Sequence, residues 1–292
     1  MKKLLFLSVG VLCLFVSLLL WPKSSIEKPK VYDCFLFFNE LELLDIRLHE
    51  MAPYVDHFVI VEAMETFRGK SKPLYFAENA SRYDAFKDKI IHVVVEEKLE
   101  TENPWDREYF QREQIMRGLK DCHKNDVILI SDVDEIVKGS CIPEIVRKIS
   151  TNQAQAIVCE QKMFYGFLNH YQSPWVGTLC TSYDRVKNMT VYLTRKLRNG
   201  SRRKLRRAHI NRFEKVKDGG WHFTSMGGMD RWILKIESYS HTKKSAHDNW
   251  KEGEEFIQTV FNATRVPIDD SFPKYVVDHQ EYLEKIHFIS SD

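Results

Sequence analysis

Three carboxylates stand together near the middle of the chain, directly after an apolar segment. Residues 126–131 are rich in Val, Ile and Leu, and the acidic side chains that follow are Asp132, Asp134 and Glu135. Such an apolar run is typical of a strand buried on both faces, and ligands of open α/β sheets gather where these strands end. Two carboxylates one residue apart can bind one Mg2+ or Mn2+ ion, because these ions prefer oxygen ligands. The pattern therefore indicates a divalent metal site that could hold a diphosphate.

An Asp-x-Asp motif after a strand also fits two other interpretations. Acidic residues commonly cap the helix that follows a strand. Phosphatases of the haloacid dehalogenase type place the same motif directly after a hydrophobic strand and use its first Asp as a nucleophile. Here Ser131 separates the strand from the motif, and Ile136 follows Glu135. These two positions weaken the phosphatase interpretation, which stays as an alternative.

The composition is that of a globular protein. Of its residues, 43% are hydrophobic and 29% are charged. Its length of 292 residues is enough for one large or two small domains. Its formal net charge is only +2, so we expect no nucleic-acid partner. The sharpest charge feature is a basic run within residues 195–207. We interpret this run as a solvated hairpin that turns at Asn199-Gly200, or as a contact for an acidic lipid or an anionic glycan.

The first residues resemble an export signal. Lys2 and Lys3 precede an apolar run over residues 4–21, close to the shortest length that spans a bilayer. No small-residue cleavage site closes this run, so we expect residues 1–21 to be an uncleaved signal anchor, followed by a short stalk over 22–30 and a catalytic domain over 31–292. The paired lysines predict a cytoplasmic tail. The expectation is a single-pass type II membrane protein, in the Golgi lumen of a eukaryote or in a bacterial cell envelope.

Cysteines and glycosylation sequons add little. No Cys-x-x-Cys pair is present, so the sequence indicates neither a zinc site nor a disulfide scaffold. If the host is eukaryotic, four Asn-x-Ser/Thr sequons are candidate glycan sites, at Asn79, Asn188, Asn199 and Asn262.

Strand and helix patterns alternate through the first half of the chain. Apolar residues at helical spacing, such as Leu41, Leu44, Leu48 and Met51, identify the helices. The predicted strands cover residues 31–38, 55–63, 90–95, 126–131 and 154–159. The predicted helices cover residues 40–51, 80–88, 106–121, 229–239 and 245–262. This alternation predicts an α/β fold with a mostly parallel central sheet and helices on both faces.

Several ordered blocks resemble those of one known family. They are residues 32–35, 38–42, 61–63, 66–70, 72–74, 131–136 and 220–223 with Gly227-Gly228. Together they make the chain similar, over roughly residues 31–290, to glycosyltransferase family 17, best known for β-1,4-mannosyl-glycoprotein 4-β-N-acetylglucosaminyltransferases. The resemblance implies a GT-A type, Rossmann-like nucleotide-sugar fold, a UDP-GlcNAc donor and a Mn2+ or Mg2+ ion. It further implies an inverting β-1,4 transfer to a mannose hydroxyl of an N-glycan acceptor.

Under this resemblance, Asp132 and Asp134 hold the metal on the donor diphosphate, with Asp134 the direct ligand favoured. His222 is the candidate third ligand, although a His between aromatic residues is as often a core residue, and His241 is a weaker alternative. Glu135 is interpreted as a partner that orients a ligand, or as a helix cap.

An inverting transfer needs a carboxylate that removes the proton of the acceptor hydroxyl. The candidates are Asp230, which is favoured, Glu160 and Glu237; each could equally be a solvated residue or an ion-pair partner.

Donor-binding candidates lie nearer the start of the sheet. Glu62 ends a predicted strand, Arg68 and Lys70 follow it, and Arg112 and Arg117 lie on the helix before the motif, with Arg117 assigned to the surface. An exported phosphatase or hydrolase that uses the same carboxylates remains as an alternative function, as does a glycan-binding protein without turnover.

Overall fold

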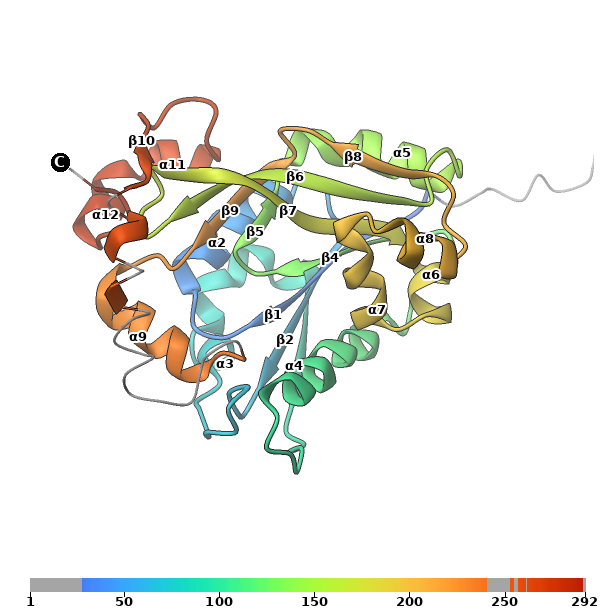
Figure 1. Cartoon of the computed structure of the whole chain (residues 1–292), viewed down its shortest axis with the longest axis horizontal. Coiled ribbons are helices and arrows are strands. Elements are labelled where there is room, and N and C mark those ends of the chain that lie inside the picture. Colours follow the sequence, from blue (N-terminus) through green and yellow to red (C-terminus); the bar gives the residue numbers. More distant parts are fainter. Residues whose placement is uncertain (1–27, 241–252, 255–256, 261, 291–292) are drawn as a thin grey trace, which may run out of the picture.

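A single curved sheet forms the centre of the computed structural model, which describes residues 28–240, 253–254, 257–260 and 262–290 (Figure 1). Within these residues the sheet has ten strands in the order β3-β2-β1-β4-β7-β6-β9-β5, with β10 beside β7 and β8 beside β6. The first four strands are β1 Val31–Phe37, β2 His57–Ala63, β3 Ile90–Val95 and β4 Val127–Asp132. The others are β5 Glu135–Val137, β6 Ala156–Tyr165, β7 His170–Ser182, β8 Phe213–Val216, β9 Gly220–Thr224 and β10 Thr264–Arg265.

The first half of the sheet is parallel. β1 pairs with β2 on one side and with β4 on the other, and β2 pairs with β3, all in parallel. The chain therefore reverses its direction of progress across the sheet between β1 and β4, which is where α/β sheets bind ligands. Antiparallel pairs enter only beyond β4, where β7 joins β4 and β6. The predicted α/β fold with a mostly parallel sheet is confirmed.

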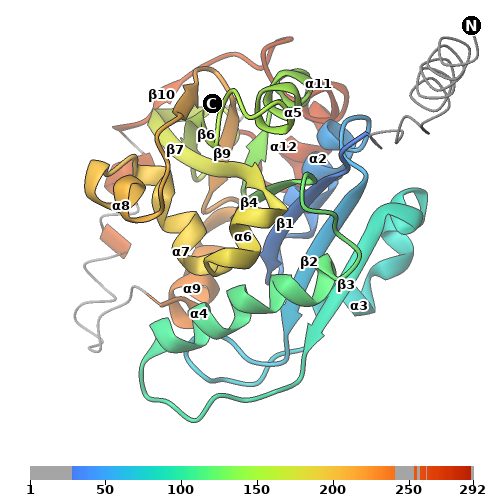
Figure 2. The same cartoon turned by 90° about the vertical axis from the view of Figure 1, so that its right-hand side faces the viewer.

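Helices cover both faces of the sheet (Figure 2). Side chains of β4 alternate between two apolar clusters: Val127 and Leu129 pack with α2 Leu41–Met51 and α5 Ile142–Ser150, whereas Ile128 and Ile130 pack on the opposite face. The helices of that opposite face are α4 Pro104–Glu113 with the 3-10 segment Gln114–Leu119, α6 Tyr183–Asn188 and α7 Val191–Arg195. The remaining helical segments are α3 Tyr75–Glu78, α8 Arg202–Arg207, α9 Gly228–Ser238, α11 Lys274–Asp278, α12 Gln280–Lys285 and the 3-10 segments Ala80–Lys89, Gly139–Cys141 and Lys196–Asn199.

Two predictions of local structure need correction. The hairpin at Asn199-Gly200 is wrong, because the segment is helical: Lys196–Asn199 is a 3-10 turn and α8 follows at once. Gly200 adopts a left-handed conformation with φ of 61°, so the Asn-Gly pair ends a helical turn instead of joining two strands. The predicted helix over 80–88 is a 3-10 segment, and the predicted helix over 245–262 lies largely outside the described residues.

The predicted membrane topology also needs correction. None of the helices in the described part of the chain is long and apolar enough to cross a bilayer. The expected anchor over 1–21 lies outside the described residues. The single-pass type II localisation therefore finds no support in the structure, and we withdraw it.

Candidate active site

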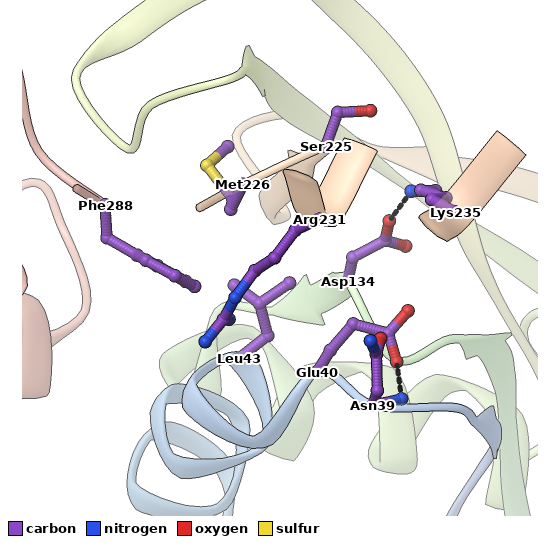
Figure 3. A pocket seen from close by; sticks show the side chains of 9 residues that line it. All are labelled: Asn39, Glu40, Leu43, Asp134, Ser225, Met226, Arg231, Lys235 and Phe288. Carbon is purple, nitrogen blue, oxygen red and sulfur yellow. Dashed lines mark hydrogen bonds and ion pairs between the residues drawn. The ribbon is translucent and has the colours of Figure 1, made fainter. Parts of the chain in front are cut away.

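The site lies where β1 and β4 end side by side. Leu36 of β1 pairs with Asp132 of β4, so Asn39 and Glu40 leave the sheet next to the segment that carries Asp134. The side chains of Asn39, Glu40 and Asp134 line a pocket (Figure 3). Its other lining residues are Leu43, Ser225, Met226, Arg231, Lys235 and Phe288. The pocket thus forms at the point of the sheet that the strand order marks as a ligand site.

A buried arginine forms hydrogen bonds with the backbone of the acidic segment. Arg47 of α2 is fully buried and donates two hydrogen bonds to the Asp33 carboxylate, Nε to Oδ2 at 2.7 Å and Nη2 to Oδ1 at 2.6 Å. Its Nη1 donates to the carbonyl oxygens of Asp132 at 2.9 Å, Val133 at 3.1 Å and Glu135 at 2.9 Å. Because one side chain binds three carbonyl groups within residues 132–135, it fixes the path of the segment that presents Asp134.

The sequence analysis did not identify Arg47 or Asp33, although both leave a signal. Asp33 is an acidic residue inside an apolar strand, and Arg47 interrupts the apolar stripe of the following helix at a buried position. Charged residues are almost never fully buried unless they are paired. Two opposite charges on adjacent apolar elements therefore indicate a buried pair.

Asp132 is bound by two arginines. Its Oδ1 accepts from Nη2 of Arg112 at 2.9 Å, and its Oδ2 accepts from Nη2 of Arg195. Burial raises the pKa of Asp132, but the positive charges of Arg195, Arg112 and Arg198 outweigh burial and hold that pKa below its ordinary value. The Asp132 side chain is still 43% exposed, whereas Arg112 is almost fully buried. The site therefore places two guanidinium groups next to an accessible carboxylate.

Glu135 ties this cluster to the sheet. Its side chain is buried and accepts from Nε1 of Trp175 at 2.9 Å, from Arg195 at 2.8 Å and from Arg198 at 2.7 Å. It also accepts the backbone N–H of Asp132 at 3.1 Å. This placement agrees with the interpretation of Glu135 as a residue that orients its neighbours. It also divides the basic run, because Arg195 and Arg198 point inward whereas the basic residues of α8 are exposed.

We expect Arg195→Gln to destabilise the protein, because the change leaves the buried Glu135 with one cation fewer. Removing one partner of a buried ion pair costs about 3–5 kcal/mol, and since Arg198 remains we expect a loss near the lower limit. Urea denaturation measures the free energy of unfolding. Arg207→Gln on exposed α8 is the matched control, with an expected change within about 0.5 kcal/mol. Equal free energies of unfolding for the two variants would show that the Arg195 ion pairs do not stabilise the fold.

Two basic side chains, those of His222 and Lys235, lie next to Asp134. Its Oδ1 lies 3.4 Å from Nε2 of His222, and its Oδ2 accepts from Nζ of Lys235 at 3.4 Å. β9 brings His222 here, since it pairs with Glu135 of β5. Burial raises the pKa of Asp134, but His222 and then Lys235 outweigh burial and lower that pKa to about 2. Asp134 is therefore a carboxylate held in its charged form.

Asp134 and His222 supply atom types that a divalent ion accepts. Nε2 of His222 and Oδ1 of Asp134 are close enough to share one ion, and the buried Nδ1 of His222 has no hydrogen-bond partner within the described residues. Those residues contain no group of three His, Cys, Asp or Glu side chains arranged to hold a metal. The pair fits an ion that takes its other ligands from phosphate and water, as Mg2+ commonly does. For Asp132 the metal role stays a prediction, and His241 lies outside the described residues.

Glu62 lies at the end of β2, as expected, but protein groups surround its carboxylate. The backbone N–H groups of Phe76 and Ala77 donate to it at 2.8 and 3.4 Å, and Nε2 of His92 lies 3.1 Å away. Nζ of Lys72 lies 3.8 Å away. Glu62 therefore anchors the start of α3, and its donor-binding role stays a prediction.

The other donor-binding candidates divide between site and surface. Arg112 reaches Asp132, as described above, whereas Arg68 is half-buried in the segment after β2. Arg117 pairs with Glu97 on the surface, at 3.3 Å, as the sequence analysis assigned it.

None of the three predicted catalytic bases lines the pocket of Figure 3. Asp230 is exposed in the first turn of α9. Glu160 accepts from Lys215 at 2.7 Å, and Glu237 accepts from Lys70 at 3.2 Å. The latter two are ion-pair partners at the surface, and the catalytic role of all three stays a prediction.

Known proteins resemble this chain in sequence. A model of glycosyltransferase family 17 matches residues 12–274. The β-1,4-mannosyl-glycoprotein 4-β-N-acetylglucosaminyltransferases of Homo sapiens and Rattus norvegicus are each 29% identical over 106 residues. Each match covers 34% of this chain and 20% of the relative, so the chain spans about a fifth of the length of these relatives.

Two solved structures are similar to this chain at low sequence identity. S. aureus TarS 1–349 in complex with UDP-GlcNAc is 12% identical with a TM-score of 0.40, over 87% of this chain and 73% of that chain. The mannosyltransferase PcManGT from Pyrobaculum calidifontis, in complex with GDP-Man and Mn2+, is 10% identical with a TM-score of 0.46, over 88% and 70%.

Proposed function

Because the chain belongs to glycosyltransferase family 17, we propose that it transfers N-acetylglucosamine from UDP-GlcNAc to a mannose hydroxyl of an N-glycan, in a β-1,4 linkage and with inversion. The observation that carries this proposal is the position of Asp132-Val133-Asp134, where β4 ends beside β1 in a chain of this family. The names of the relatives support N-acetylglucosamine as the transferred sugar and the β-1,4 linkage.

Asp134 and His222 are the residues that would hold a Mn2+ or Mg2+ ion, because they bring a carboxylate oxygen and an imidazole nitrogen together. When bound, the ion neutralises negative charge on the departing UDP. The ammonium group of Lys235 lies 3.4 Å from Oδ2 of Asp134. It therefore adds a second positive charge that can offset the negative charge of the departing UDP.

Arg112 and Arg195 contact the donor diphosphate from the side of Asp132. Each is buried and keeps one guanidinium nitrogen without a hydrogen-bond partner in the described residues, Nη1 of Arg112 and Nε of Arg195. An unpaired buried N–H costs free energy, and a phosphate oxygen would satisfy it. Asp132 keeps both arginines in place before the donor binds.

The direct test is transfer by the purified protein with UDP-GlcNAc, Mn2+ and a defined N-glycan. We expect the glycan to gain one N-acetylhexosamine by mass spectrometry. We also expect EDTA to stop the release of UDP and excess Mn2+ to restore it, because the ion binds the diphosphate.

The same assay separates the alternatives. UDP release without a glycan product, or phosphate release from simple esters, would contradict the transferase and support a hydrolase. Glycan binding without any UDP release would instead support a binding protein. Transfer from UDP-glucose in preference to UDP-GlcNAc would overturn the proposed donor alone.

A further inference from the structure

Glu40 lies in the pocket next to Asp134, and its carboxylate forms no ion pair with any described residue. From this arrangement we infer that Glu40 is the general base of the transfer, and that its free oxygen takes the proton of the acceptor hydroxyl. The inference deepens the proposed function and rests on it. The sequence analysis placed Glu40 in a matching block but gave it no role.

The backbone holds the Glu40 carboxylate in position. Oε2 accepts the N–H groups of Phe38 at 3.2 Å and Asn39 at 3.0 Å, which leaves Oε1 free of these bonds. Glu40 is the residue before α2 and closely follows β1, so two rigid elements fix its backbone. In Figure 3 its carboxylate faces Asp134 across the pocket. A base must be aimed in this way, because proton transfer requires a fixed short distance.

The two carboxylates of the pocket have opposite electrostatic environments. Burial raises the pKa of Glu40, and the negative charge of Asp134 adds to it, although Lys235 acts in the opposite direction. By contrast, the pKa of Asp134 falls to about 2. Asp134 is thus bound by His222 and Lys235, whereas among the described residues the Glu40 carboxylate is held by two backbone N–H groups alone. This difference in partners leaves Glu40 as the carboxylate of the pocket that can accept a proton.

The step conserves atoms and charge. The acceptor hydroxyl oxygen forms a bond to the anomeric carbon while Glu40 takes its proton. The bond from that carbon to the phosphate oxygen breaks, and its electron pair leaves with UDP. Lys235, from α9, lies in the same pocket and balances charge on the leaving group. The products are the glycoside, UDP and protonated Glu40, which then loses its proton to water.

The test compares Glu40→Gln with a matched control on the same helix. A glutamine oxygen can accept the same two N–H groups, so we expect the variant to fold. Glu50 is also a carboxylate of α2 that accepts a backbone N–H, from Gly139 at 2.8 Å, and burial raises its pKa too. It does not line the pocket, so Glu50→Gln controls for the loss of a buried carboxylate. Asp230→Asn tests the rival base.

We expect Glu40→Gln to lower kcat by about 10²–10⁴-fold, the range for loss of a general base. The donor KM and the Kd of UDP should change by less than about threefold, because a proton acceptor acts only in the transition state. Glu50→Gln should keep the wild-type kcat.

Three results would overturn the inference while leaving wild-type transfer intact. They are a Glu40→Gln kcat near that of wild type, a rise in the Kd of UDP that accounts for the lost activity, and a loss confined to Asp230→Asn. Absence of transfer in the wild type would instead refute the proposed function.

Discussion

Replacement of Asp134 by asparagine is expected to lower kcat by about a thousandfold or more, equivalent to about 4 kcal/mol of transition-state stabilisation. The change removes the only carboxylate that contacts both His222 and Lys235 among the described residues. Without its charge, the proposed metal pair loses its anionic ligand and Lys235 loses its fixed position. Initial rates of transfer at saturating UDP-GlcNAc measure the effect.

The control for this experiment is Asp218→Asn. Asp218 is also an aspartate bound by a lysine, Lys138 at 2.9 Å, but it is about half exposed and does not line the pocket. We expect it to keep wild-type activity, and circular dichroism should show both variants folded. An Asp134→Asn enzyme with a kcat within tenfold of wild type would refute the metal assignment, since loss of such a ligand costs far more.

The second large effect concerns stability. Arg47→Met is expected to lower the free energy of unfolding by about 3–5 kcal/mol, the cost of leaving one partner of a buried ion pair uncompensated. Asp33 would remain fully buried without its bidentate partner, and the carbonyl oxygens of Asp132, Val133 and Glu135 would lose a donor. Methionine is shorter and lacks the guanidinium group, so the space it leaves at this buried position adds to the loss. Urea denaturation at neutral pH measures the change.

Two further variants make this prediction specific. Asp33→Asn combined with Arg47→Met should recover part of the loss, because the double variant no longer buries an unpaired charge. Arg147→Met on α5 is the exposed counterpart: its arginine pairs with Glu144 at 2.7 Å, and we expect a change within about 0.5 kcal/mol. If Arg47→Met cost no more than Arg147→Met, the buried pair would not hold the acidic segment.

The parallel half of the fold follows from periodicity in the sequence, whereas the contacts of the site do not. Leu44, Leu48 and Met51 repeat at helical spacing, and apolar runs mark each parallel strand, so local pattern decided these elements. Asp132 and Glu135 share the partner Arg195, which lies 60 or more residues further along the chain. Arg195 belongs to a run of basic residues whose local sequence looks like that of a solvent-exposed surface. No local signal selects which arginine of such a run turns inward.

The candidate bases illustrate the same limit. Asp230 was favoured among the predicted bases, yet it lies exposed in the first turn of α9, and Lys235 of that helix lines the pocket instead. Glu40 directly precedes a helix that carries an apolar stripe, so the sequence indicates only a helix start. Its position beside Asp134 depends on the parallel pairing of β1 with β4, which neither segment reveals alone.

The segment that carries the three carboxylates is held from both halves of the chain. Arg47, from the first helix after β1, binds its backbone, and Arg195 and Arg198, encoded about 150 residues later, bind its side chains. A fragment that ended before residue 195 would contain every strand of the parallel half, but Glu135 would be buried without an arginine. The acidic segment can therefore adopt its observed conformation only after the C-terminal half of the chain has packed against it. Formation of the site is thus coupled to folding of the whole domain.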